Sequence, residues 1–294
     1  MKNLPGISFL NKEDIISILQ TAKAYKETFY KKTEFEKILQ AKTIINLFFE
    51  ASTRTRTSFE IAAKNLGGQV INIDMKMSSL KKGETIKDTV QNLEQMHPTA
   101  FIVRHPDSGF PLFLSKNTSI PVVNAGDGAF EHPSQALLDF FTMWEKKKKM
   151  EGIKLSIIGD ILHSRVARSN IFLQKMFKND VMVFGPQTMI PPQIEKLEVK
   201  VAKNLKEACT DRDFIMLLRI QLERKSGKSI PSLSEYYKYF ALKEVKDVYI
   251  LHPGPVNKDI EIATPLLYCP RSLISEQVEN GIFIRMAIFH HLLK

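Results

Sequence analysis

The segment from Ser52 to Ser58 reads STRTRTS and alternates hydroxyl side chains with two arginines. The preceding run, TIINLFF, is typical of a buried strand, and the following run, SFEIAAKNL, is typical of a helix. A helix that begins here offers free backbone N–H groups and a partial positive charge. The hydroxyls of Ser52, Thr53 and Thr55 add donors, and the planar guanidinium of Arg54 suits phosphate oxygens. The segment therefore predicts an anion-binding site built without a glycine-rich loop.

The same composition also suits ordinary helix capping, with Ser52 or Thr53 as the cap and the arginines in surface ion pairs. Residues two apart on a helix point in different directions, so Arg56 is expected to form a supporting ion pair rather than to share a ligand with Arg54. The sequence contains no GxxxxGK[ST], GxGxxG, HExxH, GxSxG or paired CxxC motif. These absences disfavour nucleotide-binding loops and covalent hydrolases, and we expect neither a metal nor a cofactor.

Short apolar runs alternate with amphipathic stretches along the chain, which predicts parallel sheets covered by helices. The expected strands are residues 43–49, 69–73, 100–103, 121–124, 154–158, 181–184, 214–218 and 248–251. The expected helices are residues 12–30, 85–95, 134–148, 165–177 and 275–293. We expect two parallel-sheet α/β/α domains, formed by residues 1–133 with 273–294 and by residues 134–272. The last helix then returns to the first domain.

Polar clusters follow most of the expected strands, and ligands of open α/β sheets bind outside the carboxyl ends of strands. The candidate binding side chains share a cationic or hydrogen-bonding character and include no acid: Arg54, Lys82, Arg104, His132, Gln135, Arg165, Arg219 and Gln221. Such a set suits a substrate with several negative charges. It also suits a reaction driven by positioning and oxyanion stabilisation rather than by a covalent nucleophile.

The chain has 294 residues and a formal net charge of +10. This charge suits the attraction of small anions, binding to a nucleic acid or membrane surface, or a lysine-rich surface with no partner. We expect no nucleic-acid partner, because the sequence has no aromatic-rich recognition motif and its candidate arginines follow strands. No apolar run reaches about eighteen residues, so no membrane partner is expected.

The compartment is suggested by the cysteines and by the N-terminal segment. Cys209 and Cys269 lie far apart in the sequence and form no CxxC pair. The segment MKNLPGISFLNKED lacks the long apolar core of a signal peptide. We therefore expect a cytoplasmic protein with two reduced thiols.

Five motifs occur in the order typical of one family: FFEASTRTRTSFE, SSLKKGET, VRHP, NAGDGAFEHPSQALLD and LHPGPVN. Over nearly its whole length the chain resembles the aspartate/ornithine carbamoyltransferase family. The resemblance implies transfer of the carbamoyl group of carbamoyl phosphate to the α-amine of L-aspartate, giving N-carbamoyl-L-aspartate and phosphate in pyrimidine biosynthesis. Ornithine members carry H-C-L-P and S-M-G segments, whereas this chain has HPGP and RIQ. Arg219 would repel the cationic side chain of ornithine, which favours aspartate.

The resemblance also assigns roles to individual residues. The carbamoyl phosphate site would contain Ser52, Thr53, Arg54, Thr55, Ser79, Arg104, His132 and Gln135. The aspartate site would contain Lys82, Arg165, Arg219, Gln221 and the main chain at Pro253 and Gly254. Catalysis would depend on Arg54, Thr55, Lys82, Arg104 and His132, while His252 would be structural. The residues Glu50, Arg165 and Arg224 match positions that form domain-bridging ion pairs in relatives.

In this family the loop that carries Ser79 and Lys82 enters the neighbouring subunit's site, which implies a homotrimer with shared active sites. The chain departs from some relatives by having Gly254 in place of leucine and by lacking a glycine between Leu80 and Lys81. The second departure leaves open whether Lys81 or Lys82 is the shared lysine. A sister transferase with another amine acceptor and a catalytically silent scaffold are rival interpretations of the same residues. The sequence also leaves open association with a regulatory chain or a dihydroorotase.

Overall fold

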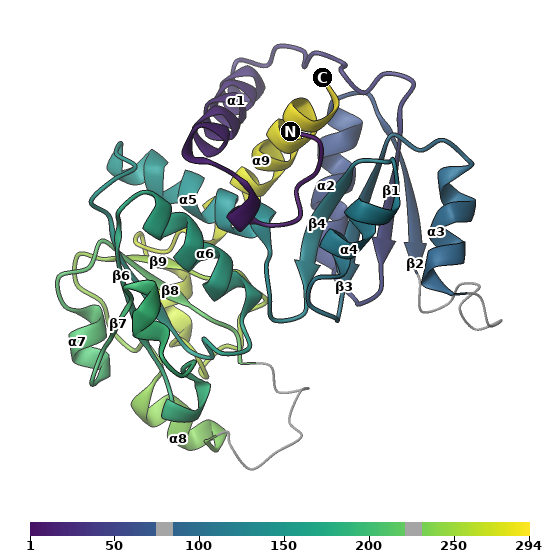
Figure 1. Ribbon diagram of the computed structural model, residues 1–294. Coiled ribbons are helices and arrows are strands. Elements are labelled where there is room, and N and C mark those ends of the chain that lie inside the picture. The colour runs from purple at the N-terminus through teal and green to yellow at the C-terminus, as the bar shows by residue number, and fades with distance from the viewer. Residues whose placement is uncertain (75–84, 221–230) are drawn as a thin grey trace. The chain divides into compact units, whose positions relative to one another are not determined.

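The computed structural model describes residues 1–74, 85–220 and 231–294. The chain forms two compact units. Unit 1 contains Met1–Leu138 and Glu279–Lys294, and unit 2 contains Asp139–Val278. Each unit has a parallel sheet accompanied by helices (Figure 1), so the predicted α/β class with two parallel sheets is confirmed.

Unit 1 is built on a four-stranded parallel sheet in the order β2-β1-β3-β4. Its strands are β1 (Thr43–Phe48), β2 (Gln69–Asp74), β3 (Ala100–His105) and β4 (Val122–Asp127). Strands β1, β3 and β4 are buried almost throughout, as expected when helices cover both faces of a parallel sheet. At the β4 edge, Leu4 forms a parallel bridge with Val123, so the N-terminal segment covers part of that edge.

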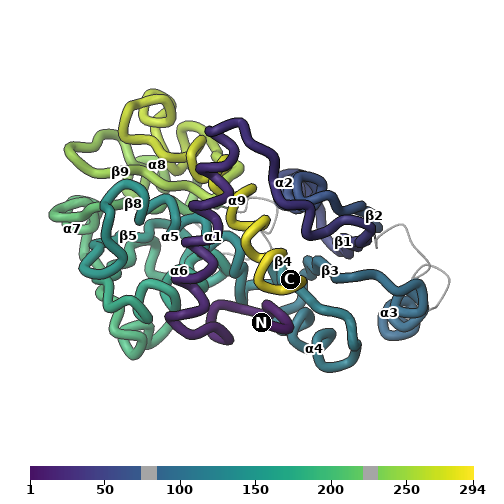
Figure 2. The backbone as a smooth tube through the Cα atoms, turned by 90° about the horizontal axis from the view of Figure 1, so that it is seen from above, coloured from purple at the N-terminus to yellow at the C-terminus, as the bar shows by residue number. Residues whose placement is uncertain are grey.

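Helices cover both faces of the unit 1 sheet (Figure 2). On one face, α3 (Ile86–Glu94) and α4 (Phe110–Asn117) contribute Val90 and Leu114 to a buried apolar cluster with alternate residues of β1 and β3. On the opposite face, α2 (Thr53–Asn65) packs on α9 (Ile274–Leu293). The rings of Phe59 and Phe289 join these two helices, with centroids 5.9 Å apart.

The C-terminal part of α9 lies beside α1 (Lys12–Tyr30) in unit 1, as Figure 2 shows. The Tyr25 hydroxyl is 2.9 Å from His290 Nδ1, and the Thr21 hydroxyl is 2.9 Å from His291 Nε2. These contacts confirm the prediction that the last helix returns to the first domain.

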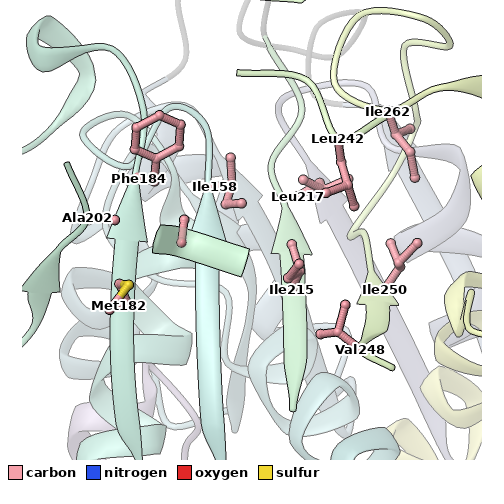
Figure 3. Close-up of a cluster of buried hydrophobic side chains, with 11 residues drawn as sticks. Ile158, Met182, Phe184, Ala202, Ile215, Leu217, Leu242, Val248, Ile250 and Ile262 are labelled. Atoms are coloured by element: carbon pink, nitrogen blue, oxygen red, sulfur yellow. The ribbon is translucent and has the colours of Figure 1, made fainter. Parts of the chain in front are cut away.

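Unit 2 is built on a five-stranded parallel sheet in the order β7-β6-β5-β8-β9. Its strands are β5 (Lys154–Ile158), β6 (Asp180–Phe184), β7 (Lys200–Val201), β8 (Phe214–Leu217) and β9 (Tyr249–Leu251). Alternate residues such as Ile158, Phe184 and Leu217 form a buried apolar cluster (Figure 3). Helix α7 (Leu205–Cys209) packs against it, and its Ala208 carbonyl accepts a hydrogen bond from the buried Ser156 hydroxyl at 2.6 Å.

The remaining helices connect these strands. They are α5 (Pro133–Lys147), which begins in unit 1 and ends in unit 2, α6 (Arg165–Met176) and α8 (Leu233–Tyr239). Short 3₁₀ turns are η1 (Ile7–Phe9), η3 (Gln187–Met189), η4 (Ile194–Leu197) and η6 (Thr264–Tyr268). Within residues 1–74, 85–220 and 231–294, every helix is too short or too polar to cross a lipid bilayer.

The differences from the sequence prediction concern short elements. Strand β7 has two residues, and helices α4, α7 and α8 have eight, five and seven residues. Segments of this length span about two turns of helix or less, so they show too few repeats for a periodic pattern to emerge. Local caps mark two of them: the Asn204 side chain accepts the Glu207 N–H at the start of α7, and Ser232 forms a capping box with Glu235 at the start of α8.

The three histidines of unit 1 whose pKa values are lowered, His105, His290 and His291, predict a loss of stability in acid. Burial of each imidazole is the main cause of the shift. The unfolded chain then binds protons more tightly than the folded chain, so stability is full above about pH 6.5 and falls as the pH drops toward the folded pKa values. We expect the Tm to fall on acidification from about pH 7 to about pH 5.

The double variant His290→Gln, His291→Gln should show a flatter dependence of Tm on pH. The exposed Gln20 of α1 has no ionisable group and offers a control, and Gln20→Ala should keep the wild-type slope. A double variant with the wild-type slope would contradict the assignment of this acid sensitivity to the contact between α1 and α9.

Candidate active site

The strand order of unit 1 reverses between β1 and β3, because the chain passes from β1 to β2 on one side and then to β3 on the other. Open α/β sheets bind ligands outside the carboxyl ends of the strands at such a switch point. Strand β1 leads into Ser52–Thr55, and β3 ends with Arg104 and His105. Arg104 is paired in register with Phe48, the last residue of β1. The anion-binding segment and Arg104 therefore flank the switch point.

Helix α2 begins at Thr53, with Ser52 in the N-cap position. The Ser52 side chain makes no capping hydrogen bond, so the simple capping interpretation of this serine is wrong. Thr53 and Arg54 are exposed, whereas Thr55 is buried and fixes the first turn against the unit. The exposed face of this turn thus presents backbone N–H groups, a hydroxyl and a guanidinium, which together suit a phosphate.

Arg104 is held in place by contacts within unit 1. Its Nε donates a hydrogen bond to Glu50 Oε1 at 2.7 Å, and its Nη1 donates to the Ala125 carbonyl at 3.3 Å. The Arg104 carbonyl accepts the Phe49 N–H at 2.9 Å. Because both partners of the ion pair are mostly buried, the guanidinium is restricted to one direction at the end of the sheet.

His132 and Gln135 lie at the start of α5, after the carboxyl end of β4. Both are buried, with 4% and 9% of their surface exposed. The His132 carbonyl accepts the N–H groups of Gln135 and Ala136 at 3.0 and 3.2 Å, so it closes the first turn of the helix. The backbone of His132 is therefore fixed by the helix that it begins.

The turn between β4 and His132 is fixed by the buried carboxylate of Asp127. Its Oδ1 accepts the Glu131 N–H at 3.0 Å and the Asn124 side-chain amide at 2.9 Å, and its Oδ2 accepts the Gly109 N–H at 2.6 Å. Each bond satisfies a polar group that burial would otherwise leave unpaired. The turn consequently has little freedom to move.

Glu131, which directly precedes His132, holds the N-terminal segment. This fully buried carboxylate accepts the Ile7 N–H at 2.6 Å and the Ser8 hydroxyl at 2.7 Å. A Cβ atom at Gly6 would overlap the Glu131 carboxylate, so glycine is required there by space. The N-terminal segment therefore packs against Glu131, next to the backbone of His132.

His105 has a structural role despite its place in the VRHP motif. Its ring stacks on Phe110 with centroids 3.9 Å apart, and its Nδ1 accepts the Asp107 N–H at 3.0 Å. Burial lowers its pKa, so the ring is neutral near pH 7. It shapes the end of β3 next to Arg104.

The strand order of unit 2 reverses between β5 and β8. Arg165 follows β5 at the start of α6, where the Ser164 side chain caps the helix by accepting the Ala167 N–H at 3.1 Å. Arg219 follows the end of β8 by two residues, and it is half-buried. Two arginines thus flank the switch point of this sheet as well.

The third segment at this edge follows β9 and carries Pro253 and Gly254. Gly254 has φ of +63°, which favours glycine, and it precedes a cis peptide bond to Pro255. The buried His252 accepts the Gly254 N–H through Nδ1 at 2.8 Å, in keeping with a structural role for this histidine. The Pro253–Gly254 backbone is thereby fixed at the carboxyl edge.

Some expected site residues, Ser79, Lys82 and Gln221, lie outside the described residues, as do Lys81 and Arg224. Glu50 forms its ion pair with Arg104 of its own unit. Within the described ranges, no three His, Cys, Asp or Glu side chains gather in a way that could hold a metal ion.

The site residues predicted from the sequence include no acid, and no role was predicted for the buried acids Asp127, Glu131 and Glu261. The first two lie inside the NAGDGAFEHPSQ segment and the third lies nine residues after His252. The available signal for the first two was a pair of acids in a motif without lysine or arginine, and no motif marked Glu261. Their partners are backbone N–H groups, which no side-chain pattern reveals.

The two domain models of the aspartate/ornithine carbamoyltransferase family match nearly the whole chain. The carbamoyl-P binding domain matches residues 2–145, and the Asp/Orn binding domain matches residues 151–292. The chain belongs to the aspartate/ornithine carbamoyltransferase family.

Within that family, the chain is similar to named aspartate carbamoyltransferases. The aspartate carbamoyltransferase catalytic subunit of Caldicellulosiruptor bescii is 49% identical over 99% of this chain and 97% of the relative. The aspartate transcarbamoylase of Trypanosoma cruzi in complex with carbamoyl phosphate and aspartate is 28% identical, covers 100% of this chain and 97% of its own, and superposes with a TM-score of 0.91. The ornithine carbamoyltransferase of Pyrococcus furiosus is 27% identical with a TM-score of 0.88, over 99% and 97% of the two chains.

The burial of Glu131 predicts that Glu131→Gln is costly. The amide cannot accept from both the Ile7 N–H and Ser8, so a buried donor is left without its partner, which costs about 1–3 kcal/mol of unfolding free energy. The kcat should fall as well, because Glu131 is joined to His132 by one peptide bond. Urea unfolding and steady-state kinetics measure the two effects.

Glu94 provides a matched control on the surface. It accepts the Ser119 N–H at 2.9 Å and the Ser119 hydroxyl at 2.5 Å, in the same pattern as Glu131 but only partly buried. Glu94→Gln should change the unfolding free energy by less than about 0.5 kcal/mol. Equal losses in the two variants would contradict the role given to burial.

Proposed function

We propose that the chain transfers the carbamoyl group of carbamoyl phosphate to the α-amine of L-aspartate, giving N-carbamoyl-L-aspartate and phosphate in de novo pyrimidine biosynthesis. Family membership and the near full-length similarity to a bacterial catalytic subunit support this reaction. One observation carries the proposal. In each unit, arginines lie at or just beyond the carboxyl ends of the two strands on either side of the switch point: Arg54 and Arg104 in unit 1, Arg165 and Arg219 in unit 2.

Unit 1 binds carbamoyl phosphate. The first turn of α2 holds the phosphate through its backbone N–H groups, the hydroxyls of Ser52, Thr53 and Thr55, and the guanidinium of Arg54. Ser79, on the shared loop, adds a hydroxyl. Arg104, His132 and Gln135 hold the carbamoyl end. The cationic site balances the dianionic phosphate, and the net charge of +10 favours the approach of both anionic substrates.

The reaction needs no covalent nucleophile, because phosphate is already a good leaving group. The deprotonated α-amine attacks the carbonyl carbon, a C–N bond forms, and negative charge develops on the carbonyl oxygen. Thr55, Arg104 and His132 donate hydrogen bonds to that oxygen, and one such donor is worth about 2.7–4 kcal/mol. The C–O bond to phosphate then breaks, and the departing phosphate accepts the proton of the amine.

Unit 2 binds aspartate. Arg165, Arg219 and Gln221 hold the two carboxylates, Lys82 contributes a further cation, and the main chain at Pro253 and Gly254 contacts the substrate. Arginine suits carboxylates because its planar fork can donate two parallel hydrogen bonds. The same guanidinium repels the ammonium group of ornithine.

Phosphate release from carbamoyl phosphate tests the reaction and distinguishes it from a sister transferase and from a silent scaffold. We expect release with aspartate, and only background release with ornithine or with no acceptor. Release with ornithine alone would identify a sister transferase. No release above background with either acceptor would rule out the proposed reaction.

The division of roles between the units predicts opposite kinetic effects for two arginines. Arg54→Ala removes a group that holds the reacting phosphate, so kcat should fall by about a hundredfold or more with a small change in the KM for aspartate. Arg219→Ala removes a carboxylate ligand and should chiefly raise the KM for aspartate by about tenfold or more. Interchanged effects in steady-state kinetics would contradict the assignment.

We further propose a homotrimer in which the loop with Lys82 completes the site of the neighbouring subunit. Arg54→Ala and Lys82→Ala homotrimers should each be nearly inactive. Mixing the two after dissociation should restore part of the activity, because some sites then receive an intact Arg54 from one chain and an intact Lys82 from the other. Mixtures that stay inactive, or an active monomer in sedimentation, would rule out the shared site.

A cytoplasmic location fits the thiols of the chain. Cys209 and Cys269 are both free, and burial raises the pKa of Cys209 to about 11. Unpaired thiols suit a reducing compartment.

A further inference from the structure

Glu261 is a buried carboxylate of unit 2 that touches two segments of the proposed aspartate site. Only 1% of its surface is exposed. Its Oε1 accepts the Ile220 N–H at 2.8 Å and the Asn257 side-chain amide at 2.6 Å, and its Oε2 accepts the Asn257 N–H at 2.8 Å. A buried carboxylate with several charge-assisted hydrogen bonds is strongly restricted in position.

The first of these segments contains Arg219. The parallel ladder of β8 ends near Leu218, whose N–H donates to the Ile158 carbonyl at 2.8 Å. Ile220 lies beyond the ladder and is 2% exposed, so its backbone groups need other partners. Glu261 accepts its N–H, and the Asn257 side chain donates to its carbonyl at 3.0 Å. The backbone of Arg219 is therefore held on both sides, by the sheet and by Glu261 with Asn257.

The second segment contains Pro253 and Gly254. Asn257 follows the cis Gly254–Pro255 bond by two residues, and both its backbone and its side chain are bound to Glu261. The buried His252, which accepts the Gly254 N–H, has its Nε2 only 3.8 Å from Glu261 Oε2. One carboxylate thus connects the end of β8 with the segment after β9.

We propose that Glu261, with Asn257, is a positioning residue that sets the direction of Arg219 relative to the Pro253–Gly254 backbone and thereby the affinity for the dicarboxylate acceptor. The inference rests on the proposed function, because it assumes that these two segments bind that acceptor. Glu261 itself does not contact the substrate. It acts through the Ile220 peptide, one residue from Arg219.

Glu261→Gln tests this role with little change in side-chain volume. One oxygen becomes an NH₂ group that faces hydrogen-bond donors, so at least one bond to Ile220 or Asn257 is lost. The KM for aspartate should rise about tenfold or more, while the KM for carbamoyl phosphate and the kcat at saturating aspartate change by less than about threefold. A KM for aspartate within about twofold of wild type in folded protein would overturn the proposal.

Asp213 supplies a matched control at the opposite end of β8. Its Oδ2 accepts the Lys154 N–H at 2.9 Å, and its Oδ1 lies 2.5 Å from Lys147 Nζ. Asp213→Asn should lower the Tm and leave the KM for aspartate unchanged. If Asp213→Asn and Glu261→Gln each raise the KM for aspartate and the KM for carbamoyl phosphate by similar factors, Glu261 acts only through stability. That result would overturn the proposal.

Asn257→Ala is the second variant, and it tests the positioning role of Glu261 and Asn257 if Glu261→Gln does not fold. It removes the side-chain bonds to Ile220 and Glu261 but keeps the Asn257 N–H bond to Glu261. It should again raise the KM for aspartate selectively, and an unchanged KM would count against the proposal.

Binding of succinate, a dicarboxylate without an amine, separates failure of this inference from failure of the proposed function. If wild type releases no phosphate with aspartate, the proposed function is wrong, and calorimetric titration with succinate then judges the inference. Binding that Glu261→Gln weakens about tenfold or more supports it. Equal binding in the two proteins, or none to wild type, overturns it.

Discussion

Parallel strands of one sheet all end at the same edge, and the reversal of strand order separates the segments that leave two neighbouring strands. In both units this constraint decides where chemistry is placed. The cationic side chains of Arg54 and Arg104 lie at this reversal in one sheet, and those of Arg165 and Arg219 lie at the reversal in the other. The buried acids Asp127 and Glu131 of unit 1 and Glu261 of unit 2 accept hydrogen bonds from backbone N–H groups. These carboxylates thus fix the backbone of segments at the same edges.

Because the cationic and the acidic side chains have separate roles, only part of the site can be predicted from the sequence. The apolar runs located every strand except the two-residue β7 to within a few residues, and the STRTRTS segment located the first turn of α2. The hydrogen-bond partners of the buried acids could not be predicted. Glu131 binds the N–H of a residue 124 positions away, and Glu261 binds one 41 positions away. Backbone N–H groups occur at every non-proline residue, so neither periodicity nor residue type identifies such a partner.

Selection of the acceptor does not depend on the fold alone. The ornithine carbamoyltransferase of Pyrococcus furiosus has nearly the same fold as this chain. A difference in acceptor therefore has to come from the side chains rather than from the arrangement of the sheets. In this chain Arg219, Ile220 and the HPGP segment lie at the carboxyl edge of the second sheet. Glu261 accepts the Ile220 N–H from 41 positions away and the nearby Asn257 N–H, so a contact remote in sequence helps to hold this edge.

The non-contiguous composition of unit 1 has a consequence for synthesis on the ribosome. Unit 2 consists of one uninterrupted stretch, whereas unit 1 needs the α9 residues that are translated after it. Domains tend to fold as units while the chain emerges. The second sheet can consequently be complete while Phe59 and its neighbours on α2 still lack Phe289 as a packing partner. During that interval the nascent chain exposes the apolar face of α2 that α9 later covers.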